Sequence, residues 1–150
     1  MTIFKNEESY CIDTNILVYA TDNASPFFSD CKALIIKGFA KELPLCLTPQ
    51  ILLEYFSVVT SPKRTLNPLK PQYAINAIKT YLEAEEILKL YPNKKTFLEL
   101  LLLTEKYKVK GANIFDLQIV ATMISNEIKK IYTYDKKHFS KFDEIEILVP

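Results

Sequence analysis

The chain has 150 residues and a mass of 17.3 kDa, which is the size of one ordinary domain, so two full domains are not expected. Hydrophobic residues make up 49% of the chain and charged residues 25%, a composition that excludes a disordered or fibrous protein. The balance of 19 basic against 18 acidic residues argues against a histone-like nucleic-acid binder with a large basic excess.

Neither a membrane span nor export is expected. The longest apolar runs, such as residues 100–103 and 16–20, are far shorter than the ~20 residues that cross a bilayer. Residues 1–10 carry charged side chains where a secretory signal needs an apolar core of about 7–15 residues. The three cysteines lack C-x-x-C spacing, which favours buried thiols in a reducing compartment over disulfides or a zinc site. We therefore expect a cytoplasmic protein.

The first half of the chain predicts two strands, each followed by a helix. Pro26 and Gly38 bracket the first predicted helix. Thr48 and Pro49 are a capping residue followed by proline at the first helical position, which is a typical helix start. In chain order, we expect a strand at residues 9–12, a helix at 26–38, a strand at 43–47 and a helix from 49 to about 61.

The second half continues the alternation after a proline-rich loop. Pro62, Pro68 and Pro71 surround Lys63 and Arg64 in a segment that cannot be helical throughout. We then expect a helix around residues 73–82, a strand at 87–90, a helix from 93 towards 111, a helix at 113–128, and strands at 130–134 and 145–149.

This alternation predicts a single α/β domain over residues 1–150, with a parallel sheet, right-handed crossovers and helices on both faces. Ligands bind such sheets at the carboxyl ends of the strands, in the crevice where the strand order reverses. Asp13 and Asp135 both follow predicted strands. If those two strands are neighbours at the crevice, the carboxylates lie about 4.8 Å apart, whereas other pairings of the five strands separate them.

Two further acids occupy unexpected places in predicted helices. Glu54 is the one charge in a helix that is apolar nearly all round, which predicts a buried helix and an acid that needs a partner, a metal ion or a proton. Asp116 lies on the apolar side of its predicted helix. The side predicted to face solvent carries Gln118, Thr122 and Ser125. Simpler interpretations stay open: a surface position for Glu54, a helix-dipole role for Asp116, and turn roles for Asp13 and Asp135.

Converging carboxylates repel one another, and two charges ~4 Å apart cost about 4 kcal/mol at an effective dielectric constant of ~20. Shared protons or a hard divalent cation can offset this repulsion. His138 is the only histidine and the sequence holds no Cys/His cluster. An all-oxygen set of donors therefore favours Mg²⁺ or Mn²⁺ over zinc.

The motifs together resemble the PIN-domain nucleases, particularly the VapC-type toxins of toxin-antitoxin pairs. The segments that carry the resemblance are Asp13-Thr14-Asn15, Glu54, Asp116 in Asn-Ile-Phe-Asp-Leu-Gln-Ile-Val-Ala, and Thr133-Tyr134-Asp135 followed by Phe139. The resemblance implies the sheet order 3-2-1-4-5, a metal-dependent endoribonuclease activity, an antitoxin partner and a homodimer. It also implies catalytic and metal-binding roles for Asp13, Glu54, Asp116 and Asp135, and positioning roles for Asn15 and Thr133.

The chain departs from the family pattern after Asp135. Family members often carry a further acid there, and this chain has lysines and His138, so we expect one well-held ion rather than two. His138 is either an acid in the reaction or an ordinary surface residue. Lysine and arginine side chains must surround an acidic site if RNA phosphates are to bind there. The candidates for these phosphate contacts are Lys63, Arg64, Lys136, Lys137 and Lys141.

The predicted function is hydrolysis of RNA phosphodiester bonds by metal-activated water, in the toxin of a type II toxin-antitoxin pair. One alternative is a non-catalytic α/β binding module that regulates a partner by contact alone. The other is a phosphate-handling domain of the receiver or phosphatase type, which forms an aspartyl phosphate. Asp13-Thr14-Asn15 lacks the second Asp of the phosphatase signature, and Glu54 has no role in that chemistry.

Overall fold

The computed structural model describes residues 6–150. Residues 1–5 lie outside the described residues, so the predictions that fall on them, as part of the domain and of a segment in which no secretory signal is expected, are not tested by the structure. Five parallel strands form one sheet in the order β3-β2-β1-β4-β5, which confirms the predicted topology. The strands are β1 (Tyr10–Ile12), β2 (Leu45–Leu47), β3 (Leu88–Lys89), β4 (Lys130–Tyr132) and β5 (Glu146–Leu148).

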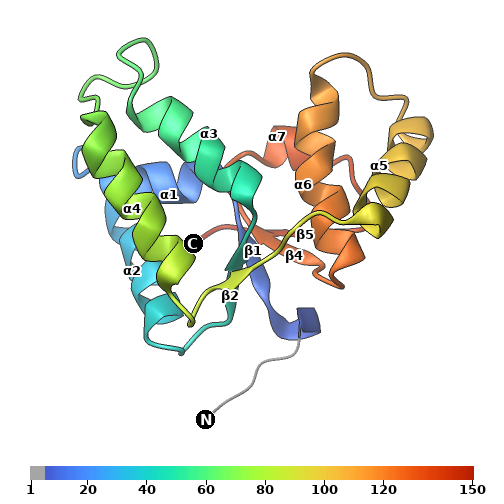
Figure 1. The fold of residues 1–150 in the computed structure, drawn as a ribbon, viewed down its shortest axis with the longest axis horizontal. Helices are drawn as coiled ribbons and strands as arrows, with labels where there is room; N and C mark the ends of the chain where they lie inside the picture. The colour runs from blue at the N-terminus through green and yellow to red at the C-terminus, as the bar shows by residue number, and fades with distance from the viewer. Residues whose placement is uncertain (1–5) are drawn as a thin grey trace.

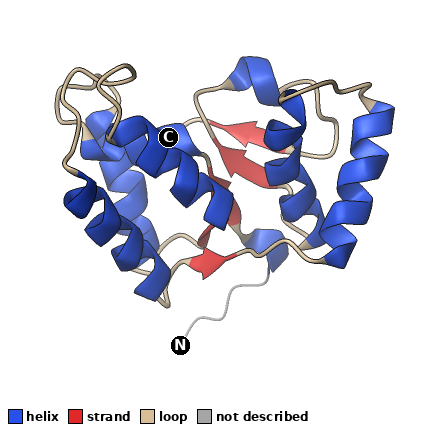
Figure 2. Cartoon of the chain, turned by 45° about the horizontal axis from the view of Figure 1, so that its top comes forward, coloured by secondary structure: helices blue, strands red, loops and turns tan. Residues whose placement is uncertain are grey.

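Seven α-helices connect the strands within residues 6–150 and cover the sheet. Helices α1 to α4 lie along one side of the sheet and α5 and α6 along the other (Figure 1), and the strands run between these two groups (Figure 2). A short 3-10 helix, Asn6–Glu8, precedes β1. The helices are α1 (Thr14–Thr21), α2 (Phe28–Phe39), α3 (Pro49–Val59), α4 (Pro71–Glu83), α5 (Lys94–Lys106), α6 (Asn113–Ser125) and α7 (Lys136–Phe139).

Helix α1 was not expected from the sequence pattern. Its short, mostly apolar run has no polar side opposite an apolar one, so the spacing of apolar residues does not predict a helix there. Asp13 acts as its N-cap, because the Asp13 carboxylate accepts a hydrogen bond of 2.7 Å from the backbone N–H of Thr14. The helix packs against both α2 and α3, and this tertiary packing stabilises an element that is too short to be stable alone.

Helix α3 begins where the sequence predicts and is less buried than expected. Thr48 is the N-cap and accepts a hydrogen bond from the backbone N–H of Ile51. The prediction that this helix is buried on every side is wrong, because Leu53 is 70% exposed. One side of α3 faces α1 and α4 and the other side is left open, so Glu54 lies at the border between the core and the solvent.

The prediction that the polar side of α6 faces solvent is also wrong. Thr122 is only 2% exposed, and its hydroxyl donates a hydrogen bond to the Gln118 carbonyl within the same helix. The Ser125 and Thr96 hydroxyls lie 2.7 Å apart, which links this side of α6 to α5. Thr122 and Ser125 therefore make hydrogen bonds inside the protein rather than only to water, and Ser125 does so across the interface with α5.

Pro71, expected in the proline-rich loop, instead occupies the first position of α4, where its missing N–H is not needed. The three cysteines are buried and free, as predicted. Within residues 6–150, no helix is long and apolar enough to cross a membrane.

A candidate carboxylate site at the carboxyl ends of the strands

A pocket of about 530 Å³ lies where the carboxyl ends of β1 and β4 meet the surrounding helices. The two strands are hydrogen-bonded neighbours, which is the pairing that brings Asp13 and Asp135 together. Helices α3 and α6 supply Glu54 and Asp116 from opposite sides of the crevice, as Figure 1 shows for the two helices. All four predicted acids therefore line one pocket.

Asp13 is the most buried of the four acids, with 6% of its surface exposed. Burial raises its pKa to about 6, against the hydrogen bonds from Thr133 and the Thr14 backbone, which lower it. The negative charges of Glu54 and Asp135 contribute to this rise to a smaller extent. An ionised Asp13 is therefore destabilised in the folded chain, and a cation beside it would relieve that cost.

Thr133 and Asn15 hold Asp13 in one orientation. The Thr133 hydroxyl donates a hydrogen bond of 2.8 Å to Asp13 Oδ2, and Asn15 Nδ2 donates to the same oxygen at 3.3 Å. Thr133 Oγ1 also accepts a hydrogen bond of 2.9 Å from the backbone N–H of Asp135. These contacts are the ones that positioning residues would make, and they tie the end of β1 to the segment after β4.

Two residues that the sequence analysis did not single out hold Glu54. The Thr14 hydroxyl donates a hydrogen bond of 2.8 Å to Glu54 Oε2, and Gln50 Nε2 donates one of 2.8 Å to Oε1. Gln50 Nε2 also donates to the Phe115 carbonyl on α6, again at 2.8 Å. The available signals were weak: Gln50 precedes Glu54 by one helical turn, and Thr14 directly follows Asp13.

The two remaining acids differ in how their oxygens are used. Asp135 caps α7, since one of its oxygens accepts the backbone N–H of His138, and the other lies 2.6 Å from His138 Nδ1. His138 itself lines the pocket. Within the described chain no hydrogen bond engages the half-buried Asp116 carboxylate, which leaves its oxygens available to a ligand.

The donor set suits a hard divalent cation. Across residues 6–150, no three His, Cys, Asp or Glu side chains come close enough together to form a ready-made metal site. Mg²⁺ does not require such a cage, because it keeps several waters and is commonly bound through one or two carboxylates and the substrate's phosphates. Asp13, whose negative charge is destabilised by burial, and Asp116, whose oxygens are unengaged, fit that mode of binding.

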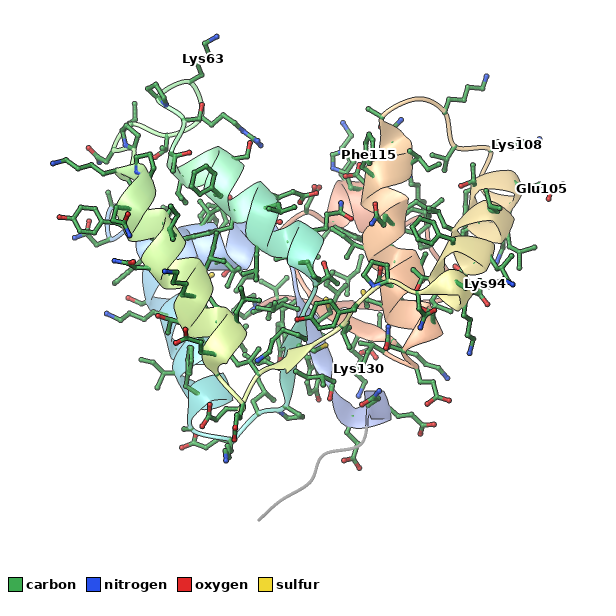
Figure 3. The ribbon with its side chains drawn as sticks, viewed as in Figure 1. Lys63, Lys94, Glu105, Lys108, Phe115 and Lys130 are labelled. Atoms are coloured by element: carbon green, nitrogen blue, oxygen red, sulfur yellow. The ribbon has the colours of Figure 1, made fainter. Side chains whose placement is uncertain are left out.

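Only one of the five predicted RNA-contacting residues lies at the pocket. Arg64 lines it and forms no ion pair within the described part of the chain. Lys63 extends outward from the tip of the neighbouring loop (Figure 3). The other three are exposed lysines that do not line the pocket, namely Lys136, Lys137 and Lys141.

Comparisons with known proteins agree with this arrangement. The PIN domain family model matches residues 10–145. The chain is 28% identical over 142 residues to Ribonuclease VapC48 of Mycobacterium tuberculosis, a match that covers 95% of this chain and 97% of that protein. It is 27% identical over 116 residues to Ribonuclease VapC43 of the same species, which covers 77% of this chain and 79% of that protein.

Two solved structures share the fold. VapBC2 from Rickettsia felis, bound to a DNA fragment from its promoter, matches with a TM-score of 0.63 at 19% identity and covers 95% of this chain and 98% of that one. Mycobacterium tuberculosis VapC20, a sarcin-ricin loop cleaving toxin, matches with a TM-score of 0.66 at 12% identity, covering 91% of this chain and 98% of that one.

Proposed function

Because the chain belongs to the PIN domain family, we propose that it is a metal-dependent endoribonuclease that hydrolyses RNA phosphodiester bonds. The observation that carries this proposal is the single pocket in which Asp13, Glu54, Asp116 and Asp135 gather from four different elements. The relatives named ribonucleases support RNA as the substrate. We further propose that residues 1–150 form one such nuclease domain.

The chemistry follows from the contacts of each acid. Asp13 and Asp116 would hold Mg²⁺ or Mn²⁺, which when bound lowers the pKa of a coordinated water and offsets charge on the phosphate. Glu54, fixed by Thr14 and Gln50, orients the attacking water or accepts its proton. Asp135 adds negative charge to the cluster, and its charge, like that of Glu54, contributes to the raised pKa of Asp13.

The surroundings of the acids supply position and phosphate binding. Thr133 and Asn15 keep Asp13 in place through their hydrogen bonds. Arg64 is the proposed phosphate contact, since it faces the pocket and lacks a carboxylate partner in the described chain. The exposed lysines, including Lys63, add a weaker attraction for RNA that falls with salt.

The test is cleavage of mixed structured RNAs with and without Mg²⁺ or Mn²⁺. Asp13→Asn and Asp116→Asn are each expected to lower the cleavage rate by about 100-fold or more. Glu83→Gln is the matched control, because Glu83 is an exposed acid at the end of α4 and lines no part of the pocket. Undiminished cleavage by either Asn variant would refute the assignment. A wild-type chain that neither cuts RNA nor binds a divalent ion would favour the binding-module alternative.

We also propose that the chain is the toxin of a toxin-antitoxin pair and binds an antitoxin protein. The support is that similar solved structures are VapBC assemblies or toxin-antitoxin complexes, including one from Klebsiella pneumoniae. Co-expression of the chain with the product of a small adjacent or overlapping reading frame is expected to yield a co-purifying complex that no longer cuts RNA. Recovery of the chain alone, with undiminished activity, would contradict the pairing.

A homodimer is the remaining part of this proposal. The outer face of α5 is apolar and more than half exposed, and its residues are Phe97, Leu98, Leu101 and Leu102. A contiguous apolar face of this kind is typical of a surface that another protein covers. We expect sedimentation to show a dimer for the wild type and a monomer for Leu101→Lys, whereas a wild-type monomer would exclude the dimer.

A further inference from the structure

Three aromatic rings form a cluster beside the carboxylate pocket. Tyr19 lies on α1, Phe27 directly precedes α2, and Tyr134 follows β4. The ring centroids of Phe27 and Tyr134 lie 4.3 Å apart, those of Tyr19 and Phe27 5.1 Å apart, and those of Tyr19 and Tyr134 5.6 Å apart. Tyr19 lines the pocket together with Asp13, so the cluster adjoins the acids directly.

The cluster is tied to two of the four segments that carry the acids, those of Asp13 and Asp135. Tyr19 belongs to the helix that Asp13 caps, and Tyr134 lies between Thr133 and Asp135. The backbone N–H of Tyr134 donates a hydrogen bond of 3.4 Å to Asn15 Oδ1. The rings therefore keep a fixed position relative to the carboxylates, which is the preorganisation that a binding subsite needs.

Aromatic rings offer flat, apolar faces on which a nucleobase can stack. The cluster is therefore suited to an uncharged, flat group rather than to a phosphate, and Arg64 offers the phosphate contact elsewhere in the pocket.

The rings are only partly buried, although Tyr19 and Tyr134 also pack against the core. Phe27 is 37% exposed, and Tyr19 and Tyr134 are half-buried rather than buried. Nucleobases stack on aromatic rings in single-stranded nucleic-acid sites, and stacking tolerates any base because every base has a flat face. Bases in a duplex are already stacked and paired, so such rings accept only unpaired ones.

We propose that Tyr19, Phe27 and Tyr134 form a stacking platform for an unpaired base next to the scissile phosphate of the RNA. The platform rests on the proposed nuclease function and deepens it, because it assigns to three named rings the contact with a base beside the cut. It contributes to binding in the ground state and in the transition state alike, so its loss raises KM and leaves kcat unchanged.

The experiment combines protein variants with altered RNA. Short single-stranded oligoribonucleotides carry one abasic nucleotide at successive positions around the cut, and KM and kcat are measured for each. For the wild type, one abasic position is expected to raise KM by about 5- to 150-fold, the range of base stacking on aromatic side chains. For Phe27→Leu and Tyr19→Leu, that same abasic position is expected to raise KM by less than about twofold, since the stacking partner is already gone.

One control variant and one optical measurement complete the design. Phe39→Leu removes a ring from the Phe39–Tyr81 pair, which lines no part of the pocket, and is expected to leave KM unchanged. A 2-aminopurine at the sensitive position is expected to lose fluorescence on binding to the wild type in EDTA, and to lose much less on binding to Phe27→Leu.

The outcomes separate the platform from the nuclease itself. If the wild type cuts RNA, and every abasic position raises KM equally in the wild type and in Phe27→Leu, the platform is refuted while the nuclease stands. Equal quenching of 2-aminopurine by the wild type and Phe27→Leu refutes it as well, even where a variant folds poorly enough to obscure the kinetics. A wild-type chain that neither binds nor cuts RNA removes both proposals.

Discussion

Replacing Asp13 by Asn is expected to stabilise the metal-free chain at neutral pH. In the folded state the pKa of Asp13 is raised from 3.8 to about 6, so the carboxylate form costs free energy that the unfolded chain does not bear. Below the pKa of Asp13 in the unfolded chain, the contribution of this carboxyl to the free energy of unfolding is fully present. That contribution is lost as the pH rises through the folded-state pKa of about 6. The loss amounts to ~3 kcal/mol of unfolding free energy at neutral pH.

Asn removes that loss but also removes part of the hydrogen bonding. An amide oxygen still accepts the Thr14 backbone N–H, whereas the amide nitrogen replaces the oxygen that now accepts from Thr133 and Asn15. Each lost bond costs about 1 kcal/mol. The expected net gain is therefore roughly 1–2 kcal/mol near pH 7, and it should become a net loss near pH 4, where Asp13 is protonated in the folded wild type.

Urea unfolding of the wild type and Asp13→Asn in EDTA, followed from about pH 4 to about pH 8, measures this difference. Glu83→Gln is the control and should show no such crossover, since Glu83 is exposed. Adding Mg²⁺ should stabilise the wild type more than Asp13→Asn. A difference between wild type and Asp13→Asn that does not change with pH would refute the reasoning, because the effect would then not arise from the ionisation of Asp13.

Three further predictions follow from single contacts. Thr133→Val removes a hydrogen bond that lowers the pKa of Asp13, so the acid limb of the pH-rate profile should move to higher pH, which cleavage rates across pH would show. Arg64→Gln should weaken RNA binding and lower the slope of log affinity against log salt by about 0.7, with a smaller change for Lys63→Gln; titrations at several salt concentrations test this. Thr48→Ala removes the N-cap of α3 and should lower the unfolding free energy by about 1 kcal/mol, measured in urea, with activity retained per folded molecule.

The order and type of most elements follow from local sequence signals. Thr48 with Pro49 marks the start of α3, and Asn93 caps α5 through a reciprocal pair of hydrogen bonds with Thr96. The alternation of elements predicts the parallel sheet. The strand order was expected from the resemblance to PIN-domain nucleases and is confirmed, because alternation alone leaves several pairings of five strands possible.

Features that depend on tertiary contacts were not predictable in the same way. Helix α1 forms because Asp13 caps it and two other helices pack on it, and neither condition is visible in a short apolar run. Thr122 is hydrogen-bonded within α6, and Ser125 is hydrogen-bonded to α5. The polar pattern of α6 therefore predicted a solvent-exposed side where the structure has a helix interface. The support of Glu54 by Thr14 likewise joins residues 40 positions apart.

The Gln50 side chain links helix α3 to helix α6. Its amide nitrogen donates one hydrogen bond to Glu54 on its own helix and one across the crevice to the Phe115 carbonyl on the opposite helix. Its amide oxygen is buried without a hydrogen-bond partner in the described chain, so the group has no second anchor to fall back on. A movement that separates α3 from α6 would break the hydrogen bond to Phe115 and so release the Gln50 amide that helps to hold Glu54.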